Sequence, residues 1–115
     1  MGSGITARQQ AALERLVRIA QADTGQGRRT AEFLLSWWNA SNCGGFDLTT
    51  LWGVDVEIAA DMVTVFALVA SCQRYPDDLG YGEEFRRIVH AWRPELQQGS
   101  KSGTADFHQT GLIHR

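Results

Sequence analysis

Lysine is nearly absent from this chain, which has one Lys and ten Arg against 13 acidic residues and a formal net charge of −2. Without an excess of positive charge or a basic tail, the chain lacks what non-specific nucleic-acid binding depends on. Long apolar runs are missing too. No stretch approaches 18 consecutive apolar residues, and no charged and then apolar segment opens the chain. We therefore expect neither a membrane span nor a signal peptide, and a cytoplasmic location.

Cysteine is also scarce. Cys43 and Cys72 are too few for a disulfide framework, and neither has a second Cys or His at the spacing that metal ligands need. We expect two free thiols in a reducing compartment, no metal and no cofactor. Asp47, close to Cys43 in the chain, is expected to raise the pKa of that thiol, which makes a reactive cysteine the less favoured interpretation.

The sequence does contain enough apolar residues to form one domain. The chain has 115 residues, 43% of them hydrophobic, which is enough for a single core. We predict an all-α fold: a compact bundle of about four main helices plus a short helical turn. A flexible leader is expected over residues 1–6, the helical domain over 7–96 and a polar, disordered tail over 97–115.

Capping signals place the expected helices. Thr6 and Gln9 form a capping box for a first helix that reaches about Ala22. After a glycine turn over 23–27, a second helix is expected over 28–40 and a helical turn from Asp47 to Trp52. Asp55 should cap the longest helix, 56–74, and a last helix over 83–93 should stop at Pro94. The core-facing stripe predicted for the long helix is Ala59, Met62, Val63, Phe66, Val69 and Ala70, widened by Ile58 and Val65.

Six strings along the chain carry a family resemblance. They are Asp23-Thr24-Gly25-Gln26-Gly27-Arg28-Arg29, Phe33-Leu34-Leu35-Ser36-Trp37-Trp38-Asn39, Cys43-Gly44-Gly45-Phe46-Asp47-Leu48, Leu51-Trp52-Gly53-Val54-Asp55, Tyr75-Pro76-Asp77-Asp78-Leu79-Gly80-Tyr81-Gly82 and Ala91-Trp92-Arg93-Pro94-Glu95-Leu96. Together they resemble a small uncharacterised domain family of proteobacterial plasmids and integrative elements. The resemblance covers roughly residues 11–96. It implies a bacterial cytosol and a mobile-element setting, and it assigns no catalytic or binding residue.

No group of residues predicts catalysis. A hydrolase needs a nucleophile with a positioned base or paired carboxylates, and none stands out. His90 is expected on the outer face of the last helix, and His108 and His114 in the tail. The Asp77–Asp78 pair is interpreted as a soluble turn rather than a magnesium site. We therefore expect a protein that is not an enzyme.

Uneven charge suggests a partner surface instead. Residues 41–80 carry six acids against Arg74, whereas residues 1–40 carry five Arg against three acids. The favoured hypothesis is a protein partner that meets acidic and aromatic residues: Trp37, Trp52, Asp55, Tyr75, Asp77, Asp78 and Tyr81. The alternative is a nucleic-acid-associated accessory protein that uses an arginine face: Arg8, Arg15, Arg18, Arg28 and Arg29. The sequence leaves a homo-oligomer open as well.

Overall fold

The computed structural model describes residues 4–99 and is helical throughout, with no strand in that range. In chain order the helices are α1 (Ala7–Ala20), α2 (Gly25–Cys43), the 3-10 helix η1 (Leu48–Gly53), α3 (Val56–Cys72), the 3-10 helix η2 (Pro76–Leu79), α4 (Gly82–Trp92) and α5 (Pro94–Gly99). The predicted all-α fold of four main helices and a helical turn is confirmed. Residues 1–3 of the expected leader and 100–115 of the expected tail lie outside the described residues.

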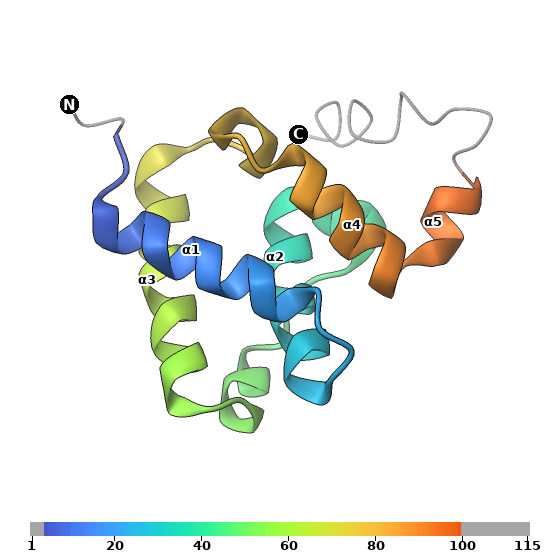
Figure 1. Ribbon diagram of the computed structural model, residues 1–115, viewed down its shortest axis with the longest axis horizontal. Coiled ribbons are helices and arrows are strands. Elements are labelled where there is room, and N and C mark those ends of the chain that lie inside the picture. Colours follow the sequence, from blue (N-terminus) through green and yellow to red (C-terminus); the bar gives the residue numbers. More distant parts are fainter. Residues whose placement is uncertain (1–3, 100–115) are drawn as a thin grey trace.

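Helix α1 is the central element of the fold. It crosses the molecule and packs against both α2 and α3, while α4 packs on α2 (Figure 1). Fully buried side chains from all four long helices form the core. They include Leu13 and Leu16 of α1, Leu34 and Leu35 of α2, Val65 and Leu68 of α3, and Phe85 and Ile88 of α4. Helices α2 and α3 contact each other at few positions, so each is held mainly by α1.

The start of α1 is the predicted capping box. The Gln9 backbone N–H donates to Thr6 Oγ1 at 3.0 Å, and the Thr6 backbone N–H donates to Gln9 Oε1 at 3.1 Å. Two of the backbone donors that a helix start leaves free are thereby satisfied. The residues that follow bury one face, so local capping and hydrophobic spacing together position α1.

Helix α2 begins three residues earlier than expected, because its glycines belong to the helix and not to the turn. Thr24 is the N-cap and accepts from the Gly27 backbone N–H at 2.8 Å. A Cβ at Gly27 would overlap the carbonyl oxygen of Ala22 and lie 2.8 Å from that of Ile19. Gly27 therefore lets the first turn of α2 approach the end of α1 closely, which positions the two helices.

The end of α2 is bent. Asn39 is buried, its backbone leaves the helical region (φ −163°, ψ 81°), and its Oδ1 accepts from the Asn42 backbone N–H. The helix then continues to Cys43. Gly44 follows with φ 103°, a positive value that glycine adopts without steric cost.

The face that α3 buries differs from the predicted one. Ile58, Met62, Val65, Leu68 and Cys72 are buried, whereas the side chains of Val63 and Phe66 are 62% and 64% exposed. The prediction was wrong for these two residues and for Ala70, which is also exposed, because α3 is apolar on most sides, so spacing alone does not say which side meets α1. Asp55 does precede the helix as its N-cap residue, but its side chain makes no capping hydrogen bond.

The end of the domain is tied back to the bundle. Trp92 Nε1 donates to the Ala20 carbonyl at 2.7 Å, and Arg93 Nε donates to the Cys43 carbonyl at 3.0 Å. Pro94 follows the last long helix, as predicted, but it also starts the short helix α5. Residues 97–99, expected in the tail, belong to that helix.

Candidate functional site

One stretch of the chain carries all the exposed large apolar side chains of the described residues. They are Leu48 (68% exposed), Trp52 (84%), Val56 (82%), Val63 (62%) and Phe66 (64%), and they lie on η1 and α3. Scattered exposed apolar residues are ordinary on a protein surface, but a contiguous group is typical of an interaction surface. We call these five residues the apolar surface.

A groove runs beside this surface. Phe33 of α2, Phe46 and Leu48 form one wall, and Met62, Val63 and Phe66 of α3 form the other, around a volume of about 270 Å³. The rings of Phe33 and Phe46 meet edge to face, with centroids 5.2 Å apart, which fixes one wall. The lining is entirely apolar, so the groove suits apolar side chains and offers no polar group for chemistry.

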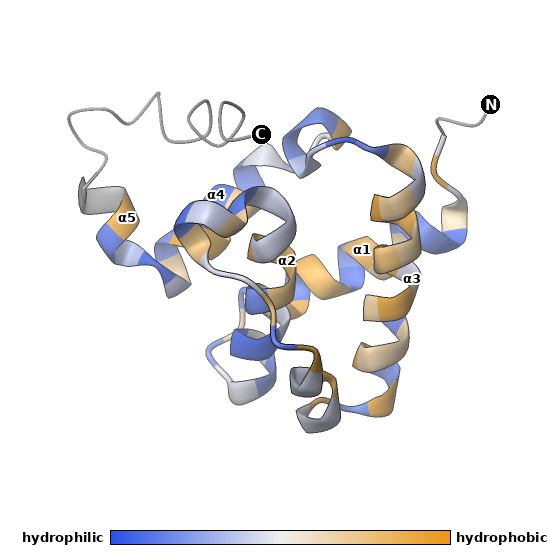
Figure 2. Cartoon of the chain, turned by 180° about the vertical axis from the view of Figure 1, so that it is seen from behind, coloured by the Kyte–Doolittle hydropathy of each residue, from blue (hydrophilic) through white to orange (hydrophobic). Residues whose placement is uncertain are grey.

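Apart from Glu57 in its first turn, the exposed face of α3 carries no charge. Besides Val56, Val63 and Phe66, it presents Ala60, Ala67 and Ala70, all exposed. Figure 2 shows α3 coloured as hydrophobic along most of its length, at an edge of the molecule. A helix that is apolar all round is normally covered on all sides. In this chain α1 covers only one side of α3.

Charged residues stand at the ends of this face. Asp47 precedes η1, where hydrogen bonds from Thr49 lower the pKa of its carboxyl. Asp55 and Glu57 stand at the start of α3 and are exposed, and Arg74 lies just beyond its end. Asp61 is not available to a partner in the same way, because Arg15 of α1 holds it in a two-pronged ion pair at 2.8 and 2.9 Å. This pairing also raises the pKa of Arg15.

Three of the predicted partner-binding residues lie at or near the groove and η1. Trp52 is the most exposed of the large apolar residues. Trp37 is half-buried, and its Nε1 donates to the Arg74 carbonyl at 3.0 Å, so it joins α2 to the end of α3. It lines the continuation of the groove next to Phe66. Asp55 is exposed, and its backbone N–H donates to Gln26 Oε1 at 2.7 Å.

The other predicted residues do not form an exposed aromatic cluster. Tyr81 is buried, and its hydroxyl donates to Glu14 Oε2 at 3.1 Å. Burial, with this hydrogen bond, raises the pKa of the Tyr81 phenol. Tyr75 and Asp77 are half-buried, which leaves Asp78 as the exposed one of the four. Helix η2 folds this loop back, so that its aromatic rings pack on the core.

The predicted arginine face is divided by the fold. Arg8, Arg18 and Arg28 are exposed, whereas Arg15 is occupied by Asp61. Arg29 is half-buried, and its side chain passes close to Gly53, where a Cβ would lie 3.0 Å from Arg29 Nε. Among the described residues, Arg8, Arg18 and Arg28 thus have neither an ion pair like that of Arg15 nor close packing like that of Arg29.

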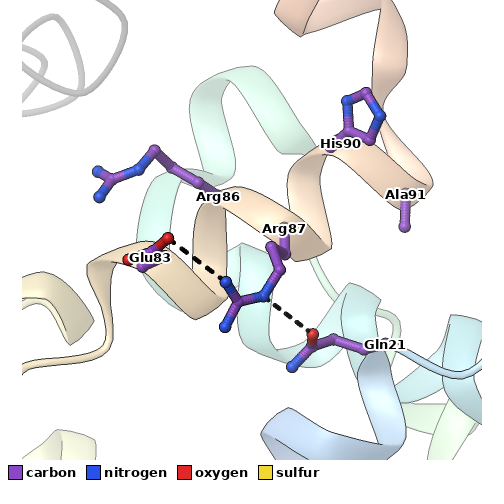
Figure 3. A pocket seen from close by; sticks show the side chains of 6 residues that line it. All are labelled: Gln21, Glu83, Arg86, Arg87, His90 and Ala91. Carbon is purple, nitrogen blue, oxygen red and sulfur yellow. Dashed lines mark hydrogen bonds and ion pairs between the residues drawn. The ribbon is translucent and has the colours of Figure 1, made fainter.

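A second, shallow pocket lies on the outer face of α4. Gln21, Glu83, Arg86, Arg87, His90 and Ala91 line it (Figure 3). Arg87 is engaged on both sides, by Glu83 at 3.5 Å and by Gln21 Oε1 at 3.3 Å. His90 is exposed, as predicted, and no nucleophile stands beside it. This arrangement is that of a solvated helix face.

The thiols offer no reactive site. Both cysteines are buried and free, as expected. Burial raises the pKa of the Cys43 thiol to about 11, Arg93 lowers it in part, and Glu95 adds to the rise. The predicted direction is confirmed, but the main cause is burial and not Asp47. Within residues 4–99, no group of three or more His, Cys, Asp or Glu side chains is placed to hold a metal ion.

A family model covers most of this fold. Residues 10–93 match the family of unknown function DUF7673, from the first turn of α1 to just past α4. The chain belongs to the DUF7673 family. Comparison with curated proteins gave no match, and comparison with solved structures gave none either. No helix among the described residues of this DUF7673 protein is both long enough and apolar enough to cross a membrane.

Sequence reasoning missed most of the apolar surface. Of its five residues only Trp52 was predicted to bind a partner, and Val63 and Phe66 were assigned to the core. A signal was available: from Met62 to Cys72 this DUF7673 helix carries no charge on any side. A helix exposed to water on one side normally has polar residues there, so that absence points to a covered face.

Proposed function

We propose that this protein works by binding another protein chain and not by catalysis, and that it binds through the apolar surface of η1 and α3. The observation that carries the proposal is the grouping of Leu48, Trp52, Val56, Val63 and Phe66 on one stretch of the chain, beside an apolar groove. Burial of such a group removes apolar area from water, which is the main favourable term in protein association.

The setting we propose is the cytoplasm of a bacterium, in an accessory role for a plasmid or an integrative element. The sequence strings described above support this setting by their resemblance. Support for a non-catalytic role comes from the lining of the groove, which contains no titratable side chain, and from the raised pKa of Cys43. Acidic residues next to the apolar surface, Asp47 and Asp55, favour partners that carry basic groups near apolar ones.

A capture experiment with matched variants tests this proposal. The immobilised wild type, a Val63→Glu/Phe66→Glu variant and an Arg18→Gln/Arg28→Gln variant are exposed to nuclease-treated bacterial lysate, and bound proteins are identified by mass spectrometry. The two variants change the net charge equally but alter different surfaces. We expect the glutamate variant to lose at least 90% of each specific partner, because binding would bury its two new carboxylates. The arginine variant should keep the partner.

The reverse pattern would reject the proposal. Recovery that depends on Arg18 and Arg28 and disappears after nuclease treatment would instead indicate a nucleic-acid partner, since phosphate contacts require these positive charges. Recovery that neither variant alters would exclude both surfaces.

A further inference from the structure

The exposed apolar residues of α3 are arranged so that the same face of a second copy of the chain would fit against them. At about 100° per residue, its apolar positions fall on one stripe centred on Val63. They lie in pairs at equal distances before and after Val63: Ala60 and Phe66, Ala59 and Ala67, Val56 and Ala70. A twofold axis through Val63 would bring each residue opposite its counterpart from a second, antiparallel α3. Large side chains would then face small ones, Phe66 against Ala60 and Val56 against Ala70.

Charges distinguish between an antiparallel and a parallel arrangement. The first half of the stripe has Asp55 and Glu57 beside it. The second half has Arg8, which lines a shallow pocket with Thr64 and Ala67, and Arg74 just past the helix end. An antiparallel pair brings the acidic half of one copy against the basic half of the other. A parallel pair would place like charges together and align the helix dipoles unfavourably.

The size of the apolar surface agrees with such a contact. Three large apolar side chains of the stripe and two of η1, each more than 60% exposed, supply apolar area for it. A stable interface uses about 800 Å² from each partner, including a polar rim. The three exposed alanines and the terminal charges would supply the remainder, and alanines also allow two helices to approach to about 8 Å.

We propose that the partner covering α3 is a second copy of this chain, in a symmetric dimer built on antiparallel α3 helices that cross at Val63. The inference rests on the proposed function, because it names one occupant of the same apolar surface. Antiparallel contacts of this kind are isologous and close on themselves, so the assembly stops at two chains.

Sedimentation equilibrium of the full chain, over a hundred-fold range of concentration, tests the dimer. We expect wild type to reach twice the chain mass and Val63→Glu to raise the dissociation constant at least 100-fold, since two carboxylates would meet at the axis. Val56→Glu is a second variant that should not disturb the fold. Val56 is more exposed than Val63, and a carboxylate in the first turn of a helix is favourable. Circular dichroism verifies that both variants fold.

Cysteine cross-linking tests the register. Val63→Cys should form a covalent dimer under mild oxidation, and Ala70→Cys alone should not, because its two copies would lie about 21 Å apart along the helices at 1.5 Å per residue. A mixture of Val56→Cys and Ala70→Cys chains should cross-link to each other. Wild type is the control, since Cys43 and Cys72 are buried. Self-cross-linking of Ala70→Cys as strong as that of Val63→Cys would overturn the antiparallel arrangement.

A monomer at every concentration would overturn this inference and leave the proposed function standing, provided that Val63→Glu/Phe66→Glu still abolishes capture of another protein. A monomer whose captured proteins do not change with that double variant would reject both.

Discussion

Gly27 shows how much of the helix packing depends on one missing side chain. Its place in the first turn of α2 puts the Ala22 carbonyl, just past the end of α1, where a Cβ would stand. We expect Gly27→Ala to lower the free energy of unfolding by about 1–3 kcal/mol, because overpacking outweighs the gain in helix propensity. Urea unfolding followed by circular dichroism measures it.

Gly45→Ala is the matched control for that substitution. A Cβ at Gly45 meets no atom within 4 Å, and its φ is not positive, so we expect a change below about 0.5 kcal/mol. Equal losses at positions 27 and 45 would contradict the close approach of α2 to α1.

Cys43 provides a prediction about reactivity. Because burial raises the pKa of its thiol to about 11, the thiolate fraction at pH 8 is roughly one in a thousand. We expect its alkylation by iodoacetamide, followed by mass spectrometry of the Cys43 peptide, to accelerate about ten-fold per pH unit up to pH 10. A rate that levels off near pH 8.5 would show an ordinary, exposed thiol.

The raised pKa of Cys43 also determines in which direction the stability of the fold changes with pH. A thiol that holds its proton more tightly in the folded chain contributes stability that is fully present below its unfolded pKa, near 9, and is lost as the pH rises towards 11. Cys43→Ala should therefore lose less stability than wild type between pH 9 and 11.

At the scale of elements, α3 separates two kinds of apolar position. Val65 is fully buried, whereas Val63, two residues earlier, is 62% exposed. We expect Val65→Ala to cost about 2 kcal/mol and Val63→Ala less than about 0.5 kcal/mol, measured by urea unfolding at the lowest practical protein concentration. A larger cost at Val63 under those conditions would mean that the predicted stripe, and not the observed one, faces the core.

Local signals were sufficient to predict the four long helices and η1, but not the short helices η2 and α5 or which neighbours each helix meets. Thr6 with Gln9, Asp47 and Gly44 each act through contacts a few residues away, so capping and turn rules located the helix ends near them. Gly27 was assigned to a turn. The reason for a glycine there is its close approach to the Ala22 carbonyl, which exists only because α2 packs on the end of α1. The burial of Tyr81 likewise depends on Glu14, 67 residues away.

The candidate surface was harder to predict than the fold for a related reason. Trp52 was among the residues predicted to bind a partner, and it is exposed. Val63 and Phe66 were not chosen, because exposure of an apolar helix position depends on where α1 stands. The face of α3 that packs on α1 had to be known before the opposite face could be recognised as uncovered.

For the whole molecule, a dimer makes thermal stability depend on concentration. Because assembly stabilises only the folded chain, we expect the Tm of wild type to rise by roughly 5 °C over a hundred-fold increase in concentration. The Tm of Val56→Glu should not change over that range, and scanning calorimetry compares the two. A constant Tm for wild type would argue against self-association.

The unequal burial of the four tryptophans gives the molecule an optical property of its own. The Trp38 indole is buried, those of Trp37 and Trp92 are half-buried, and that of Trp52 stands in water at the tip of the apolar surface. A water-soluble quencher such as iodide should therefore reach Trp52 first, and the red edge of the emission should come mainly from it. Whatever covers the surface should shift that emission to shorter wavelength, so the chain carries an intrinsic fluorescent reporter of its own occupancy.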